Sequence, residues 1–162
     1  MEPLPISQIA LVVNDIEEAL ERYHRVLGWG PWNVYEHKPP MLHHTRVRGK
    51  DVEYTMIGAE AHVGPIIVEM IQPVSGPSIY AEWLEEHGEG LHHIAVMRPT
   101  PETAEETRKR FLEEADAEIL MEGRIGEGIH FYYVDSQPQL KAIFESGTGH
   151  AVELKPSYVY PA

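Results

Sequence analysis

The feature that most constrains the fold is an internal repeat, in which a strand, a helix and several strands occur twice along the chain. The first copy opens on Gln8-Ile9-Ala10, and the second opens on His93-Ile94-Ala95. The copies close on Ile67-Val68-Glu69 and on Ile143-Phe144-Glu145. A unit that appears twice predicts two related modules, because one such unit cannot bury its apolar face alone.

The first copy begins with a segment typical of a buried strand. Residues 6–13 are almost all apolar or β-branched. An amphipathic helix is predicted next, with Asn14 as its N-cap, Glu17 completing a capping box and Gly28 ending it. Further strands are expected at 32–37, 43–48, 52–58 and 64–71, with a hairpin turn at 48–51.

The second copy has the same order of elements. A short helix over residues 78–87 would connect the copies, and residues 91–97 form another strand of the buried type. Thr100 and Pro101 indicate the start of a charged helix over about 102–115. Strands are then expected at 117–123, 129–134 and 141–146, with an additional one at 151–155.

Composition excludes several classes of function. The chain contains no cysteine, so disulfides, zinc fingers, iron–sulfur clusters and thiol nucleophiles are ruled out. Its formal net charge of -13 at pH 7 makes nucleic acid a poor partner. No apolar run approaches the roughly 18 residues of a membrane span, and the N-terminus lacks the features of a signal peptide. We therefore expect a cytoplasmic protein with no membrane contact.

Four polar side chains interrupt the apolar strands at matching places in the two copies. Each of them alone could lie on an outer, water-facing side of its strand. Together they predict a common meeting point, where two carboxylates, an amide oxygen and an imidazole would suit zinc, nickel, cobalt or manganese. The four residues are Gln8, Glu69, His93 and Glu145.

The run Gly90-Leu91-His92-His93-Ile94-Ala95-Val96, with the opening strand and helix and the segment 68–73, resembles the vicinal oxygen chelate superfamily. That superfamily includes glyoxalase I, methylmalonyl-CoA epimerase and extradiol dioxygenases, and the chain is most similar to its glyoxalase and epimerase branch. The resemblance implies an α+β fold, in which two βαβββ modules form a curved, mostly antiparallel eight-stranded sheet around a metal. The single domain over 1–162 would contain one module at about 6–73, a linker helix at 77–88 and a second module at about 91–155.

The resemblance also implies the metal ligands, which would be Gln8, Glu69, His93 and a glutamate of the final strand. Glu145 is favoured as that glutamate, while Glu153, which also follows two apolar residues, stays the alternative. The dioxygenase branch uses two histidines and one carboxylate on iron. Gln8 and Glu69 therefore argue against oxygen chemistry.

The activity implied by the resemblance is that of a divalent-metal isomerase, epimerase or lyase. Such an enzyme transfers a proton at the carbon next to a carbonyl through a metal-stabilised enolate. Glu145 is the first choice for the base and Glu69 the second. Two alternatives stay open: a lactoylglutathione lyase, and a non-catalytic small-molecule-binding protein on the same fold. A homodimer is expected because it is common in the family.

Aromatic and methionine side chains are expected to line an apolar substrate pocket. The substrate would be a small molecule such as an acyl-thioester or an aromatic carbonyl compound. A basic cluster at Arg46, Arg48 and Lys50 could hold the anionic end of a coenzyme A or glutathione conjugate, or could simply be a solvated hairpin. The candidate pocket residues are Trp32, Tyr35, Tyr54, Met56, Trp83 and Tyr132.

Overall fold

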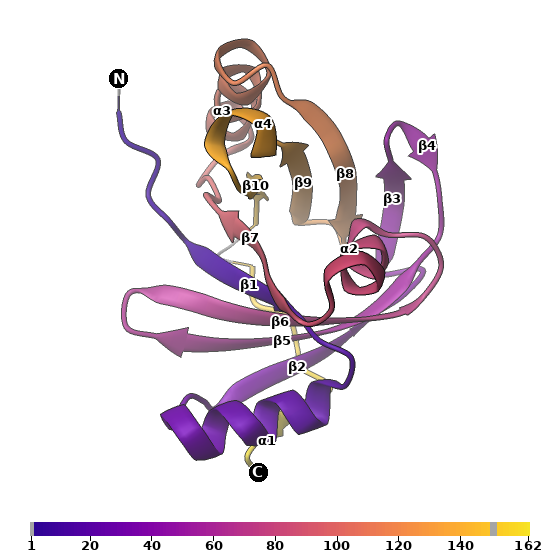
Figure 1. The fold of residues 1–162 in the computed structure, drawn as a ribbon, viewed down its shortest axis with the longest axis vertical. Helices are drawn as coiled ribbons and strands as arrows, with labels where there is room; N and C mark the ends of the chain where they lie inside the picture. Colours follow the sequence, from indigo (N-terminus) through magenta and orange to yellow (C-terminus); the bar gives the residue numbers. More distant parts are fainter. Residues whose placement is uncertain (1, 150–151) are drawn as a thin grey trace.

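The fold is a mixed α+β arrangement of one large curved sheet and four helices, seen in a computed structural model that describes residues 2–149 and 152–162 (Figure 1). The first half contains β1 (Gln8–Val12), α1 (Ile16–Leu27), β2 (Trp32–His37), β3 (Leu42–Val47), β4 (Lys50–Asp51), β5 (Thr55–Val63) and β6 (Ile66–Ser75). After α2 (Ile79–His87), the second half contains β7 (Gly90–Ala95), α3 (Pro101–Glu114), β8 (Glu118–Ile125), β9 (Ile129–Asp135), α4 (Gln137–Leu140), β10 (Ile143–Thr148) and β11 (Tyr158–Tyr160).

The sheet has the strand order β11-β2-β5-β6-β1-β7-β10-β9-β8-β3-β4. The pairs β1–β6 and β7–β10 are parallel, and the other pairs, including β1–β7 between the two halves, are antiparallel. The predicted curved, mostly antiparallel sheet is therefore confirmed. The predicted number of eight strands is wrong, because β3, β4 and β11 extend the two edges of the eight-stranded centre. The module boundaries stay a prediction.

The two additional edges are formed by an exchange between the halves. Strand β3 leaves the first half and pairs with β8 at the far edge of the second half. The C-terminal strand β11 pairs in turn with β2 of the first half. Each half thus covers an edge strand of the other, which removes unpaired backbone groups from the central sheet.

The strand register confirms that the sequence repeat is a structural repeat. In the first half, Gln8 lies beside Ile67 and Ala10 lies beside Glu69. In the second half, His93 lies beside Ile143 and Ala95 lies beside Glu145. The four polar residues therefore occupy two pairs of equivalent positions on neighbouring strands.

Local signals fix most helix ends. The N-cap of α1 is Asp15, whose side chain accepts a hydrogen bond from the Glu18 backbone N–H, so the predicted cap at Asn14 is wrong by one residue. Gly28 ends this helix in the left-handed conformation, with a φ of 70° that favours glycine. Thr100 caps α3 with Pro101 in the first turn, as predicted.

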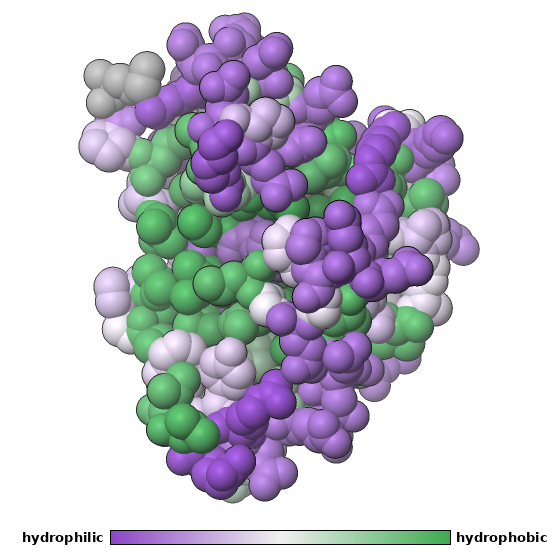
Figure 2. All heavy atoms as spheres, viewed as in Figure 1, coloured by the Kyte–Doolittle hydropathy of each residue, from purple (hydrophilic) through white to green (hydrophobic). Residues whose placement is uncertain are grey.

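The core consists of apolar side chains buried between the sheet and its helices. One cluster joins α1 to the outer side of the first half, another joins α3 to the second half, and the largest includes α2 residues Ile79 and Tyr80. Apolar side chains also gather in the middle of the face seen in Figure 2, while hydrophilic side chains cover most of the rest. None of the helices in the described part of the chain combines the length and the apolar character that a membrane span requires.

The last part of the chain differs from the sequence prediction. Residues 152–155 form no strand, and residue 151 lies outside the described residues. The strand near the C-terminus is β11, which begins at Tyr158. The short helix α4 was not predicted from the sequence.

Candidate metal centre

The four central strands of the sheet position the predicted ligands. These strands are adjacent in the order β6-β1-β7-β10, and each contributes one polar side chain to the same space. Gln8, His93 and Glu145 are buried, with 6%, 3% and 6% of their surfaces exposed, and the Glu69 side chain is 12% exposed. The structure therefore brings together all four residues that the sequence singles out.

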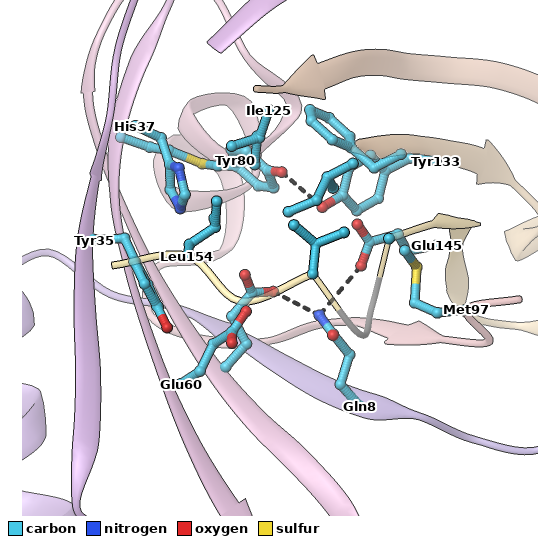
Figure 3. Close-up of a pocket in the computed structure, with 16 residues that line it drawn as sticks. Gln8, Tyr35, His37, Glu60, Tyr80, Met97, Ile125, Tyr133, Glu145 and Leu154 are labelled. Atoms are coloured by element: carbon cyan, nitrogen blue, oxygen red, sulfur yellow. Dashed lines mark hydrogen bonds between the residues drawn. The ribbon is translucent and has the colours of Figure 1, made fainter. Parts of the chain in front are cut away.

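The side chains form one compact cluster. His93 Nε2 lies 3.1 Å from Glu145 Oε2 and 3.7 Å from Glu69 Oε2. The Gln8 amide donates hydrogen bonds to the same two oxygens at 3.3 Å and 2.9 Å (Figure 3). One potential ligand atom from each of Glu69, His93 and Glu145 lies within 4.8 Å of the others, so this group could hold a metal ion.

The chemistry of the cluster fits a divalent cation. Two carboxylates lie close together in a buried place, where burial and then the charges of Glu145 and Glu60 raise the pKa of Glu69 well above its ordinary value. A cation would offset that repulsion, and carboxylate with imidazole is a normal ligand set for zinc, nickel, cobalt and manganese. A half-turn of the Gln8 amide would present its oxygen where its nitrogen now lies. Glu153 is exposed and outside the cluster.

Aromatic packing holds His93 in position. Its ring lies edge-on to Tyr133, with the centroids 4.8 Å apart, and His92 Nδ1 lies 2.9 Å from its Nδ1. The Tyr133 hydroxyl is hydrogen-bonded to the Tyr80 hydroxyl at 2.7 Å. With Nδ1 occupied in this way, Nε2 is the ring nitrogen that faces the carboxylates.

A small cavity of about 100 Å³ adjoins the cluster (Figure 3). Two of the six predicted pocket residues, Tyr35 and Met56, line it. The described residues of its lining are Gln8, Tyr35, His37, Met56, Glu60, Glu69, Tyr80, Met97, Ile125, Ile129, Phe131, Tyr133, Glu145, Gly149, Val152 and Leu154.

The other four predicted pocket residues lie elsewhere. Trp32 is fully buried in the α1 cluster and donates its indole N–H to the Trp29 carbonyl. Tyr54 is buried in the largest core cluster. Trp83 stacks on His87, its neighbour on α2. Tyr132 faces α3, where its hydroxyl donates to the Ala104 carbonyl. Each of these side chains already has a packing role in the core or on a helix.

The sequence interpretation missed several polar residues of the cavity. Glu60 is a polar residue inside an apolar strand, which is the same signal that identified the four clustered residues. Burial and the charge of Glu145 raise its pKa. Burial lowers the pKa of His37 to about 4, and burial with the charge of Glu60 raises the pKa of Tyr35.

The basic cluster does not face the cavity. Arg46 forms an ion pair with Asp51 at 2.8 Å across the exposed β3–β4 hairpin. Arg48 makes two hydrogen bonds of 2.8 Å to the carboxylate of Glu82 on α2. These arginines are thus paired within the chain, as in the alternative of a solvated hairpin.

Comparisons with solved structures agree with this topology. A hypothetical protein of Bacillus halodurans C-125 has a TM-score of 0.64 at 18% identity, covering 90% of this chain and 94% of that one. A methylmalonyl-CoA epimerase in complex with methylmalonyl-CoA and NH4+ has a TM-score of 0.58 at 22% identity, covering 96% and 100%. A Streptomyces coelicolor methylmalonyl-CoA epimerase also has a TM-score of 0.58 at 22% identity, covering 94% and 99%. At these identities the likeness shows the fold.

Sequence comparisons identify the family. The uncharacterised Bacillus subtilis protein YqjC is 29% identical over 92 residues, which is 57% of this chain and 56% of that protein. The match therefore spans little more than half of the length of that relative. A family model described as the Glyoxalase/Bleomycin resistance protein/Dioxygenase superfamily matches residues 7–133, most of the chain. The chain belongs to this superfamily.

Proposed function

We propose that this protein is a divalent-metal-dependent enzyme that transfers a proton at a carbon next to a carbonyl group, as an isomerase, epimerase or lyase. The observation that carries the proposal is the convergence of two carboxylates, an imidazole and an amide in one cluster, of which the carboxylates and the amide line a cavity. Membership of the superfamily and a fold shared with methylmalonyl-CoA epimerases support it.

Gln8, Glu69, His93 and Glu145 would hold the ion, for which zinc, nickel, cobalt and manganese are the candidates. A bound divalent cation would polarise the carbonyl oxygen of a substrate and so acidify the neighbouring C–H bond. An acyl-thioester or another carbonyl compound is the proposed substrate, since one fold neighbour was solved with methylmalonyl-CoA. The homodimer and the cytoplasmic location stay predictions.

The residues of the cluster have separable roles in this proposal. Glu145 lines the cavity and accepts from Gln8, which positions its carboxylate to remove the proton from the substrate carbon. Glu69 lines the same cavity from β6 and is the second candidate for this step. Tyr80 and Tyr133 close one side with their linked hydroxyls, which limits water around the reacting carbon.

Metal content is the first test of the proposal. Elemental analysis of the purified protein is expected to give one zinc, nickel, cobalt or manganese ion per chain. A chelator is expected to lower the melting temperature by several degrees, because a bound ion stabilises only the folded state. A protein without metal, whose melting temperature does not respond to the chelator, would instead support the non-catalytic binding protein.

Proton transfer is the second test. A panel of thioesters and hemithioacetals in D2O is screened for exchange at the carbon next to the carbonyl, followed by NMR. The Glu145→Gln variant is expected to lose this exchange, and Glu153→Gln, a matched change at an exposed glutamate of the same chain, is expected to keep it. Unchanged exchange in Glu145→Gln would remove Glu145 from the role of base.

A further inference from the structure

We propose that the cavity binds a carbonyl compound whose reacting end is uncharged or cationic, and that Glu60 excludes substrates with a free carboxylate there. This inference rests on the proposed function, because it assigns the substrate class of the same site. The net charge of the residues that line the cavity sets this preference, and it depends on residues outside the four candidate ligands.

The wall of the cavity carries an excess of negative charge. Three glutamates, Glu60, Glu69 and Glu145, line a space of only about 100 Å³. None of the described residues that line this space is a lysine or an arginine. A divalent ion would balance the charges of Glu69 and Glu145, so that Glu145 would no longer oppose ionisation of Glu60, and the Glu60 carboxylate would be left without a counter-charge.

Glu60 is the carboxylate that remains. It lies on β5 as the cross-strand partner of Glu69, and Figure 3 shows its side chain in the cavity near Gln8 and Tyr35. It does not belong to the group whose atoms could hold a metal. Within the described residues we find no hydrogen bond or ion pair to its side chain. Its carboxylate is therefore available to a ligand in the cavity.

The other polar groups of the wall suit an uncharged ligand. The hydroxyls of Tyr35, Tyr80 and Tyr133 and the imidazole of His37 can donate or accept hydrogen bonds. Burial keeps His37 neutral near pH 7, since its pKa is lowered to about 4. Ketone, amide, thioester and hydroxyl groups match these partners, whereas a carboxylate would face Glu60 without a counter-charge.

The charge of this cavity would disfavour the acyl group bound by one of the fold neighbours. One methylmalonyl-CoA epimerase was solved with methylmalonyl-CoA, whose acyl group ends in a free carboxylate. The same acyl group in this cavity would bring a fourth carboxylate beside three glutamates. A substrate without that carboxylate, or one with an amine in its place, is the better match.

The test compares two ketones of the same skeleton, levulinamide and levulinate, which differ in charge at one end. Their dissociation constants for the zinc-loaded protein are measured by ligand-observed NMR at pH 7. Levulinamide is expected to bind about tenfold more tightly than levulinate, because one uncompensated charge acts at close range. Equal binding of the two, or tighter binding of levulinate, would overturn the inference.

The Glu60→Gln variant tests the residue itself. It keeps the shape of the side chain and is expected to reduce the preference for levulinamide to within about threefold of parity. Glu21→Gln, an exposed change on α1, should retain the full preference. An unchanged preference in Glu60→Gln would overturn the role of Glu60.

The zinc content of the same samples distinguishes a failure of the proposed substrate preference from a failure of the proposed function. Protein that holds zinc but prefers levulinate would overturn this inference and leave the proposed function standing. Protein that holds no zinc would overturn the proposed function, and this inference with it.

Discussion

The two halves of the site differ most at one pair of equivalent positions, Glu60 and Tyr133. Each is the cross-strand partner of a candidate ligand, Glu60 of Glu69 and Tyr133 of Glu145. Both residues line the cavity, but the buried Tyr133 hydroxyl is already paired with the Tyr80 hydroxyl, whereas Glu60 is partly exposed and its carboxylate has no such partner among the described residues. The second half thus forms a packed wall with a paired hydroxyl, and the first half presents an unpaired carboxylate to a ligand.

The residues on β1 and β7 show the same contrast. The His93 side chain has 0% of its surface exposed and packs against Tyr133. Its counterpart Gln8 is a buried amide that donates hydrogen bonds to both carboxylates. Equivalent positions of the repeat thus carry different chemistry, an imidazole packed against an aromatic ring in one half and an amide bonded to both carboxylates in the other.

The largest expected effect is on metal affinity, and it should be unequal between the halves. His93→Ala is expected to weaken zinc binding about a hundredfold and Gln8→Ala only about tenfold, because imidazole is the stronger ligand for a borderline ion. Isothermal titration of the metal-free variants with zinc measures both. Equal losses would show that the two halves contribute alike to the ion.

A second difference between the halves is the side chain that packs over a strand glycine. His37 lies over Gly58 in the first half, and Phe131 lies over Gly123 in the second. Burial lowers the pKa of His37 from 6.5 to about 4, so the folded state binds a proton at this side chain less readily than the unfolded state does. The stability that neutral His37 contributes is therefore fully present above about pH 6.5 and is lost as the pH falls toward 4. The contribution of His37 to the free energy of unfolding should fall by about 2 kcal/mol between pH 7 and pH 5.

Urea unfolding at both pH values measures this effect in the presence of a chelator. The His37→Gln variant lacks the titrating group and serves as the reference for every other effect of pH on stability, including that of Glu69, whose pKa is raised by burial. If the wild type and His37→Gln lose the same stability between pH 7 and pH 5, His37 does not resist protonation.

The sequence predicted the parts of the fold that depend on local pattern. The two buried strands, the cap at Thr100 and the stop at Gly28 each follow from a few neighbouring residues. The meeting of Gln8 with His93 was also predictable, because a repeat relates the strands that carry them. Their role as metal ligands stays a prediction.

The parts that the sequence did not predict depend on non-local pairing and on the phase of a strand. Nothing near residues 42–47 indicates that β3 crosses to pair with β8. Strand β9 is buried on both faces, so no alternation of polar and apolar residues indicates which face lines the cavity. The sequence therefore predicts Tyr132 as a pocket residue, whereas Tyr133 lines the cavity. Glu60 was missed because the strand was expected to end at residue 58, whereas β5 continues to Val63.

The third prediction compares the two glycines directly. A Cβ atom on Gly123 would lie 2.6 Å from Phe131 Cζ and 3.1 Å from Thr45 Cγ2, whereas one on Gly58 would meet only His37 atoms at 3.3 Å. Gly123→Ala should therefore lower the free energy of unfolding by about 1.5 kcal/mol through overpacking, and Gly58→Ala by clearly less. Chemical denaturation of both variants measures the difference, and equal losses would mean that Phe131 can move aside.

The smallest expected effect tests the packed wall through a single oxygen atom. Tyr133→Phe removes one partner of the hydroxyl pair and leaves the buried Tyr80 hydroxyl without it, at a cost of about 1 kcal/mol in the free energy of unfolding. Glu60→Gln, the matched change in the first half, should leave the metal-free protein within about 0.5 kcal/mol of the wild type or stabilise it, since it removes a carboxylate charge next to Glu69. Thermal unfolding of both variants with chelator present ranks them. If Glu60→Gln is destabilised and Tyr133→Phe is not, the first half and not the second would form the packed wall.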